Sequence, residues 1–376
     1  MLRRRTCLVN GVVCHTLSMV CEKSLWHIFR VDSIKYFFRK KMVEINIGSE
    51  EWLAQVKEDI VEPDIRIIDP HHHLWDDRGS TYLVKDLQAD TGSGHNVLKT
   101  VYMECGWGYK EDGPRHLKVI GETEAVVDQA NKSKETGEAV ISAIVSRADL
   151  RLGEEVIEVL EAHEEASQGL FRGIRHAGAR AEHPDALTIP GGAPEGLFQD
   201  TGFLKGMNVL GRKGYTYDTW HYHYQNIEFA EMVKKVPDTQ MILDHFGTPL
   251  GVGPYANKRE EIFEQWKKDI KEISKSENVF MKIGGMAMPD NGFGWNNRDK
   301  PATSDEFVEA QRPYYLHAID CFGPERCMME SNFPVDRMSL SYHVLYNGLK
   351  KIVADFSDDE KDQMFYRTAE SVYAVN

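Results

Sequence analysis

The sequence lacks the features of several common protein classes. Its six cysteines never form a Cys-x-x-Cys pair, which argues against a zinc ribbon or a disulfide framework and favours a reducing compartment. No apolar run reaches the length of a membrane span. Positive charge is also scarce, since 45 Lys and Arg face 59 Asp and Glu for a net charge of -14. We therefore expect a cytoplasmic protein with no membrane or nucleic-acid partner.

The first 41 residues differ in charge from the rest of the chain. They hold nine Lys or Arg against Glu22 and Asp32, so residues 1–41 carry +7 and the remainder carries -21. An arginine-rich, acid-poor leader is typical of a mitochondrial presequence. The alternative is an upstream start, because Met42 opens a sequence that looks like the beginning of an enzyme, and we favour this interpretation. We leave residues 1–41 out of the fold prediction and treat 42–64 as a lead-in segment.

From residue 65 onward, short β-rich runs alternate with segments of helical spacing. In the helical segments apolar residues recur every three or four positions, as in Ile262, Trp266 and Ile270. The β-rich runs predict eight strands, at residues 65–69, 99–105, 139–146, 169–176, 214–220, 240–245, 278–285 and 327–334. Eight such repeats predict a parallel sheet, and its closure gives a (β/α)8 TIM barrel over residues 65–376. The alternative is an open doubly wound sheet, but no glycine-rich phosphate loop follows the first strand.

Three consecutive histidines follow the first predicted strand. Side chains alternate along a strand, so His71 and His73 share a face with Asp69, while His72 points the other way. Neutral imidazole is the commonest metal ligand, and a His-x-His pair gives one cation two ligands. The alternative is a polar strand end with solvated histidines. The spacing alone supports the two interpretations about equally.

Charged and polar residues recur where the other predicted strands end. The active site of a TIM barrel lies at the carboxyl ends of its strands, so these side chains are expected to meet there. They are Glu104, Arg172, Arg175, His221, His223, Asp244, His245, Lys282, Glu330, Asn332 and Asp336. Lys282 lies inside an apolar strand, where an unpaired charge is costly. It therefore either serves the site or forms a buried ion pair with Glu104 or Glu330.

Several blocks of the sequence resemble the amidohydrolase-2 family, in the branch of TIM-barrel metal-dependent hydrolases that includes sugar-acid lactonases. The first block is Asp-Pro-His-His-His-Leu-Trp at residues 69–75, which resembles the Asp-x-His-x-His-x-Trp signature. Further blocks resemble that branch in the same order, at residues 121–124, 171–175, 243–247, 282–285 and 330–336. The likeness extends from residue 65 to the C-terminus, and the segment before Met42 has no counterpart in the family.

The resemblance implies a single divalent metal ion, zinc or manganese, that activates a water or polarises a carbonyl. His71 and His73 would be ligands on the first strand, and His245 would be a ligand or an oxyanion partner. His223 would be a further ligand, with His221 as an equal rival. The fourth strand holds no lysine that could be carbamylated to bridge two metals, which favours one ion.

The last strand departs from the family pattern. Many relatives carry an aspartate there as metal ligand and general base, whereas this chain has Asn332, which cannot take a proton from water. Glu330, two residues earlier on the same strand face, or Asp336 in the following loop could replace it. We favour Glu330, with a charge partner for Lys282 as its alternative role. A histidine acting without a tightly bound metal also stays open.

Cationic and aromatic side chains are the candidates for substrate binding. Arg172 and Arg175 would clamp a carboxylate, Trp220 would line the pocket, and His221 and Lys282 are further candidates. We therefore expect a small anionic or polyhydroxylated substrate with a lactone or other cyclic ester bond. A metal-dependent decarboxylase of an aromatic or unsaturated acid and a non-catalytic metabolite-binding barrel are the alternatives. A homo-oligomer is left open, since the sequence shows no interface signal.

Overall fold

The computed structural model of the protein describes three parts of the chain: residues 8–9, 12–13 and 46–375. The chain divides into two compact units after Ile45. In the first unit, β1 (Leu8–Val9) pairs antiparallel with β2 (Val12–Val13). The other residues of the predicted extension, and with them the leader and the upstream start, lie outside the described residues. Among the helices that the structure describes, none is both long and apolar enough to cross a membrane.

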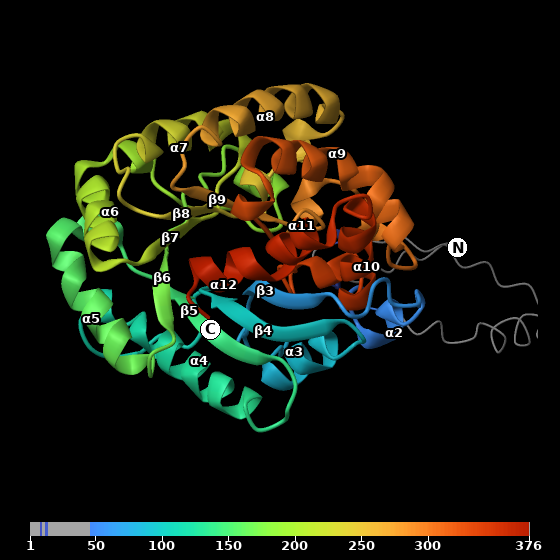
Figure 1. Ribbon diagram of the computed structural model, residues 1–376, viewed down its shortest axis with the longest axis horizontal. Coiled ribbons are helices and arrows are strands. Elements are labelled where there is room, and N and C mark those ends of the chain that lie inside the picture. The colour runs from blue at the N-terminus through green and yellow to red at the C-terminus, as the bar shows by residue number, and fades with distance from the viewer. Residues whose placement is uncertain (1–7, 10–11, 14–45, 376) are drawn as a thin grey trace, which may run out of the picture. The chain divides into compact units, whose positions relative to one another are not determined.

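The second unit is built around one sheet of eight parallel strands, which helices surround in Figure 1. The strands follow one another across the sheet in sequence order, so each neighbouring pair is joined by a crossover connection. They are β3 (Arg66–His72), β4 (Asn96–Met103), β5 (Val140–Ser146), β6 (Phe171–Arg175), β7 (Thr216–Thr219), β8 (Met241–Leu243), β9 (Val279–Ile283) and β10 (Cys327–Met329). All eight predicted strands are confirmed, with differences only at their ends.

The first and last strands of this sheet come together and nearly close it into a barrel. Just beyond β10, the amide of Asn332 donates to the carbonyl of His71 at 3.0 Å, and the amide of His73 donates to the carbonyl of Phe333 at 2.8 Å. The (β/α)8 barrel predicted from the sequence is therefore confirmed. These bonds also place the residues after β10 beside those at the end of β3, at the carboxyl edge of the sheet.

Helices cover the outside of the sheet because each presents an apolar stripe to it. In α8, Ile262, Trp266, Ile270 and Ile273 recur at helical spacing and are all buried. The helices are α2 (Glu50–Leu53), α3 (Val84–Thr91), α4 (Ile120–Ser133), α5 (Val156–Ala166), α6 (Thr201–Lys213), α7 (Asn226–Val233), α8 (Arg259–Ile273), α9 (Ser304–Phe322), α10 (Tyr342–Ile352), α11 (Asp358–Asp362) and α12 (Thr368–Val372). Because they exclude water from the strands, polar side chains inside the barrel must find partners there.

The C-terminal segment fills the amino-terminal end of the barrel. Tyr373, which follows α12, packs in one apolar cluster with the strand residues Ile68 and Val101. Arg172, near the start of β6, donates from Nε to the carbonyl of Tyr373 at 2.7 Å. This segment therefore supports the barrel interior at the amino-terminal ends of the strands, opposite their carboxyl ends.

Candidate active site

A cavity of about 960 Å³ lies at the carboxyl ends of the strands. Its volume suits a small molecule, since ligand pockets commonly measure about 300 to 1,000 Å³. Five of its polar lining residues end a strand or follow one closely: His73, Glu104, Arg175, His245 and Asn332. The position of the cavity is the one that the barrel architecture predicts for chemistry.

Two further groups of residues complete the cavity wall. Trp75, Tyr82 and Trp220 contribute aromatic surface, and of these the sequence proposed Trp220 for the pocket. Ile47 and Glu50, from the segment that precedes the barrel, form another part of the wall. The lead-in segment therefore shapes the cavity, which the sequence did not indicate.

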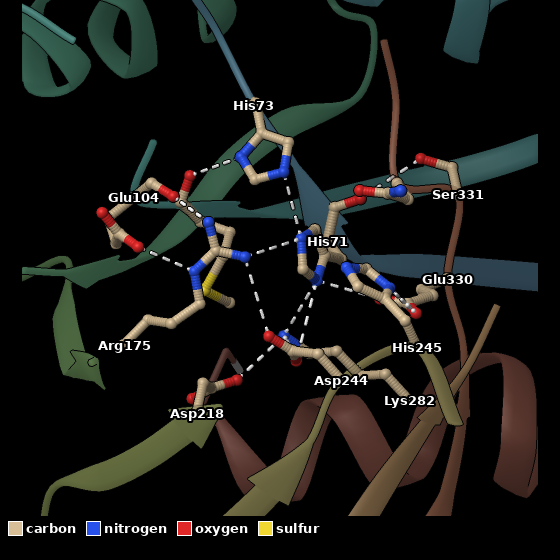
Figure 2. Close-up of polar contacts among 12 residues, drawn as sticks. His71, His73, Glu104, Arg175, Asp218, Asp244, His245, Lys282, Glu330 and Ser331 are labelled. Carbon is tan, nitrogen blue, oxygen red and sulfur yellow. Dashed lines mark hydrogen bonds and ion pairs between the residues drawn. The ribbon is translucent and has the colours of Figure 1, made fainter. Parts of the chain in front are cut away.

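Glu330 links β3 and β8 through two imidazoles, as Figure 2 shows. Its Oε1 accepts a hydrogen bond from His245 Nδ1 at 2.7 Å, and its Oε2 lies 2.9 Å from His71 Nδ1. A carboxylate can only accept, so the His245 ring carries its proton on Nδ1 and keeps the lone pair of Nε2; we assign the same tautomer to His71, whose Nδ1 faces Glu330 Oε2. Burial raises the pKa of Glu330, but the His245 and His71 rings outweigh this effect and bring the pKa to about 2. Glu330 is thus ionised and lies behind the two rings.

His73 turns its own unprotonated nitrogen toward His71. Its Nδ1 donates to the carbonyl of Met103 at 2.9 Å, so its Nε2 also keeps a lone pair. The Nε2 atoms of His71 and His73 are 3.2 Å apart, so two lone pairs face each other at hydrogen-bond distance. Burial lowers the pKa of both rings well below the usual value, which keeps them neutral. A cation bound by both nitrogens would remove this repulsion.

Asp244 follows β8 and brings a carboxylate to the same place. It is fully buried, and neither oxygen accepts a hydrogen bond from any described residue. The nearest cations are Lys282 Nζ at 3.3 Å and Arg175 Nη1 at 3.7 Å. One carboxylate oxygen of Asp244 and one ring nitrogen each of His71 and His245 lie within 4.8 Å of one another. Imidazole together with carboxylate is a donor set that suits zinc or manganese.

The buried charges around this centre do not balance. In the ion-pair network that includes His71 and Asp244, four carboxylates face two cations, which leaves a formal excess of two negative charges; the residues are Glu104, Asp218, Asp244, Glu330, Arg175 and Lys282. An uncompensated buried charge is costly, and one divalent cation would balance this excess. The residues therefore fit a single divalent ion, for which His71, His73 and Asp244 offer donor atoms, and His245 lies beside them.

Lys282 belongs to the support of this centre. Its Nζ lies 2.9 Å from Asp218 Oδ2 and 3.3 Å from Asp244 Oδ1. Burial alone would lower the pKa of Lys282, but the two carboxylates outweigh it and raise the pKa. The sequence predicted an ion pair with Glu104 or Glu330, whereas the partners are Asp218 on β7 and Asp244 after β8. Lys282 is fully buried and is not among the described residues that line the cavity, so its placement does not support substrate binding.

The two arginines of β6 lie at opposite ends of that strand. Arg175 ends the strand and lines the cavity, where its Nε donates to Glu104 Oε1 at 2.9 Å and its Nη1 lies 3.4 Å from His71 Nε2. Arg172 lies near the start of the strand and donates to backbone carbonyls, including that of Tyr373. The structure therefore separates Arg172 from the cavity, contrary to the predicted pair of substrate-binding arginines.

Both histidines that follow β7 lie outside the centre. His221 is fully buried, and its Nε2 contacts Asn226 Oδ1 at 3.1 Å. His223 accepts a hydrogen bond on Nδ1 from the amide of Leu250 at 3.3 Å and packs against Tyr255. A turn of 3-10 helix begins at His223, so the chain leaves the strand direction before this side chain could face the centre. Neither residue is placed to be the metal ligand that the resemblance implied, and His221 does not line the cavity as a substrate contact would.

Asn332 and Asp336 form a pair at the cavity wall. Asn332 lines the cavity with a backbone φ of 56°, and its Nδ2 donates to Asp336 Oδ1 at 2.9 Å. The amide of Ala287 donates to the other carboxylate oxygen at 3.1 Å. Burial raises the pKa of Asp336 to about 7. Asp336 therefore lies behind Asn332, and the Oδ1 of Asn332 is the atom left for the cavity.

The alternation expected for the histidine motif holds for His72 and fails for Asp69. His72 is buried away from the cavity and packs edge-on against Tyr102. Asp69 does not share the face of the other two histidines, because the register of β3 with β4 shifts between Asp69 and His72. Its carboxylate instead accepts from the amide of Ser331 and the hydroxyl of Tyr342, both at 3.0 Å. Asp69 thus ties β3 to the segment after β10.

Comparison with known proteins defines the class of this barrel. The family model described as amidohydrolase matches residues 68–375. The protein y4mH of Sinorhizobium fredii (strain NBRC 101917 / NGR234), itself described as uncharacterised, is 31% identical over 334 residues, which cover 83% of this chain and 99% of that protein. The chain therefore belongs to the amidohydrolase family and is a hydrolase of the amidohydrolase superfamily, as predicted.

Two more distant similarities were found. L-fucono-1,5-lactonase of Burkholderia multivorans (strain ATCC 17616 / 249) is 23% identical over 316 residues, which cover 82% of this chain and 96% of that enzyme. The crystal structure of an amidohydrolase from Burkholderia multivorans with bound zinc has a TM-score of 0.65 at 19% identity, covering 82% of this chain and 99% of the other. The second similarity shows that the two proteins share the barrel fold.

Proposed function

We propose that this chain is a metal-assisted hydrolase that opens a lactone or other cyclic ester of a small polyhydroxylated molecule. The observation that carries the proposal is the pair of unprotonated nitrogens, His71 Nε2 and His73 Nε2, which face each other at 3.2 Å beside the donor-free carboxylate of Asp244. A divalent ion held there supplies a Lewis acid for an ester carbonyl and lowers the pKa of water. Membership of the amidohydrolase family and the similarity to a sugar lactonase support the proposal.

His245 is the general base in this proposal. It lines the cavity, and its Nδ1–H donates to Glu330, so its Nε2 is free to accept a proton from the attacking water. The ionised Glu330 then stabilises the imidazolium that forms, as a buried carboxylate does in other acid–base dyads. Glu330 does not itself line the cavity among the described residues. Its role is therefore to position and polarise His245, and the direct base favoured from the sequence becomes an indirect one.

Asn332 supplies a neutral polar contact where many relatives would carry a carboxylate. Its Nδ2 is committed to Asp336, which fixes the amide and directs its oxygen to the cavity. An amide oxygen accepts a hydrogen bond from a hydroxyl group but takes no proton at working pH. Asn332 thus fits a role in binding a hydroxylated substrate, and Asp336 fits the role of holding it.

The charges of the cavity favour a neutral substrate over an anion. Arg175 is neutralised by Glu104, whose Oε1 lies 2.9 Å from its Nε. Two other arginines line the cavity: Arg337 is paired with Asp90 at 2.9 Å and with Glu50, and Arg78 is paired with Asp77 at 3.4 Å. Because each guanidinium already has a carboxylate, none of the three is free to clamp a second one. Of the two predicted substrate types, the polyhydroxylated one fits this lining better.

Aromatic side chains provide the remaining surface for such a molecule. Trp75 and Trp220 line the cavity and can pack against the apolar face of a sugar-like ring. Polar groups between them would hydrogen-bond its hydroxyls, which is the usual division of labour in small-molecule pockets. We therefore infer a neutral aldonic-acid lactone as the substrate class.

A panel of neutral sugar lactones tests the proposal. The full chain, supplied with zinc or manganese, is incubated with each lactone in weak buffer containing a pH indicator, and we expect acid release that a chelator abolishes. The His245→Asn variant should lose this activity, whereas His317→Asn, a histidine on α9 outside the cavity lining, should keep it. Release of carbon dioxide from aromatic acids without lactone opening would replace the hydrolase by a decarboxylase. Thermal stabilisation by lactones without turnover would replace it by a binding protein.

A further inference from the structure

A chain of buried contacts joins the C-terminal segment to the candidate metal centre. The hydroxyl of Tyr373 donates to Asp218 Oδ2 at 2.5 Å, and Lys282 Nζ donates to the same oxygen at 2.9 Å. Figure 2 shows Asp218, Lys282 and Asp244 grouped beneath the histidines. Tyr373, Asp218 and Lys282 are fully buried and are not among the described residues that line the cavity. These contacts therefore serve the centre and not the substrate directly.

Lys282 has two carboxylates within reach, and they compete for its ammonium. Asp218 Oδ2 is at 2.9 Å, a normal length for a charge-assisted hydrogen bond, while Asp244 Oδ1 is at 3.3 Å. No described residue donates a hydrogen bond to either oxygen of Asp244. Asp218 thus holds the ammonium, and the carboxylate of Asp244 stays available on the side of His71 and His245.

Asp218 depends in turn on two hydroxyl donors for its orientation. Thr216 Oγ1 donates to its Oδ1 at 3.2 Å, and the shorter bond from Tyr373 fixes the oxygen that holds Lys282. Tyr373 is itself immobilised, because its ring packs against Ile68 in the apolar cluster and Arg172 donates to its carbonyl at 2.7 Å. The C-terminal segment therefore holds the hydroxyl of Tyr373 in position against Asp218.

We infer that Tyr373 and Asp218 are positioning residues for the metal centre: they keep Lys282 closer to Asp218 than to Asp244, with which it forms only the longer ion pair at 3.3 Å, so that Asp244 can bind a divalent cation. This inference rests on the proposed function, since it takes the centre to bind a metal ion. When Asp218 no longer holds the ammonium, Lys282 moves to Asp244 and competes with the cation for the same carboxylate. The C-terminal segment, whose described residues do not line the cavity, thereby acts on metal affinity.

Zinc titration of the chelator-stripped full chain against a chromophoric chelator tests this coupling. Tyr373→Phe removes only the hydroxyl. Tyr366→Phe is the matched control, because Tyr366 lies in the same apolar cluster and the Cζ atom of Arg66 lies 3.8 Å from the centre of its ring. Loss of an outer-shell partner typically weakens metal affinity by about 10- to 100-fold. We expect about a tenfold weaker affinity for Tyr373→Phe, with an unchanged number of zinc ions per chain and an unchanged affinity for Tyr366→Phe.

A second pair of variants separates competition from general damage to the fold. Asp218→Asn should weaken zinc binding toward the upper end of the range, about 100-fold. Adding Lys282→Met to Asp218→Asn removes the competing ammonium and should restore much of the affinity, which a merely structural defect would not allow. Circular dichroism checks that each variant is folded, and Tyr373→Phe keeps the test decisive if Asp218→Asn does not fold.

The outcomes distinguish this inference from the function on which it rests. Three results would overturn the inference while the proposed function stands. They are a wild-type zinc affinity in Tyr373→Phe, equal losses of affinity in both phenylalanine variants, and no recovery of affinity with Lys282→Met. A wild-type chain that binds no zinc would overturn the metal-assisted function and the inference with it.

Discussion

Replacing Glu330 by glutamine tests whether one buried carboxylate sets both imidazoles of the site. Glutamine offers one acceptor and one NH2 donor, so it can accept from only one of His71 and His245 and directs a donor at the other. The pKa of about 2 for Glu330, against an ordinary value of 4.5, corresponds to about 3 kcal/mol of stabilisation at neutral pH. We therefore expect Glu330→Gln to lower the free energy of unfolding by about 3 kcal/mol at neutral pH.

The pH dependence of this difference has a defined sign. Because the pKa of Glu330 is lower in the folded protein, its stabilisation is fully present above the unfolded value and is lost as the pH falls toward 2. Urea unfolding followed by circular dichroism, with a chelator present, measures the free energy of unfolding of both proteins. The difference between Glu330→Gln and the wild type at about pH 3 should be less than about half of the difference at neutral pH. Glu325→Gln, an exposed change in the turn before β10, is the matched control and should alter stability by less than about 0.5 kcal/mol.

Equal stability of Glu330→Gln and the wild type at neutral pH would refute this reasoning. A difference that stays constant with pH would do so as well, because it would arise from packing and not from the ionised carboxylate. In either case the assignment of the Nδ1 protons of His71 and His245 would lose its basis.

Three further changes test individual placements. Asn332→Asp puts a second carboxylate beside Asp336, whose pKa burial already raises to about 7. The melting temperature of the variant, relative to that of the wild type at the same pH, should be highest in acid, below the unfolded pKa, and should fall as the pH rises through 7. Arg175→Met leaves its carboxylate partner buried and unpaired and should cost about 3 to 5 kcal/mol in urea unfolding, while Arg172→Ala should lower the melting temperature but leave the KM for any hydrolysed lactone unchanged. His223→Ala should keep the metal content of the wild type in mass spectrometry. A flat pH profile for Asn332→Asp, a raised KM for Arg172→Ala, or metal loss in His223→Ala would contradict these placements.

The strands of the barrel can be predicted because each is a short apolar run between segments of helical period. Burial on both faces suits such runs, and their regular alternation with helices implies parallel order and closure. Closure also implies that β10 lies beside β3. The approach of Asn332 to His71, far apart in sequence, therefore follows from the topology alone.

Site residues were misplaced where the backbone leaves the regular strand path. The register shift in β3 moved Asp69 off the face of the histidines, and the 3-10 turn at His223 carried that side chain out of the centre. Arg172 was misplaced for a simpler reason, since only residues near the carboxyl end of a barrel strand can reach the cavity and Arg172 lies near the start of β6. Residue type suggested function in each case, but the path of the backbone and the depth along the strand decided it.

Two residues of the centre were missed for different reasons. Asp218 could have been found, because a carboxylate within a short buried strand is the same signal that marked Lys282. Tyr373 has no such signal, since its contact with Asp218 exists only once the C-terminal segment has folded under the barrel. Local sequence patterns carry no information about a contact between residues 155 positions apart.

The most direct test of the account is the metal content of the purified full chain after equilibration with zinc and removal of the excess. Mass spectrometry should find about one zinc ion per chain, held by the imidazole and carboxylate donors of one site. A variant with both His71→Ala and His73→Ala should lose this ion while it keeps the far-ultraviolet circular dichroism of a folded barrel. A wild-type chain that retains no zinc, or a double variant that retains as much as the wild type, would contradict the account.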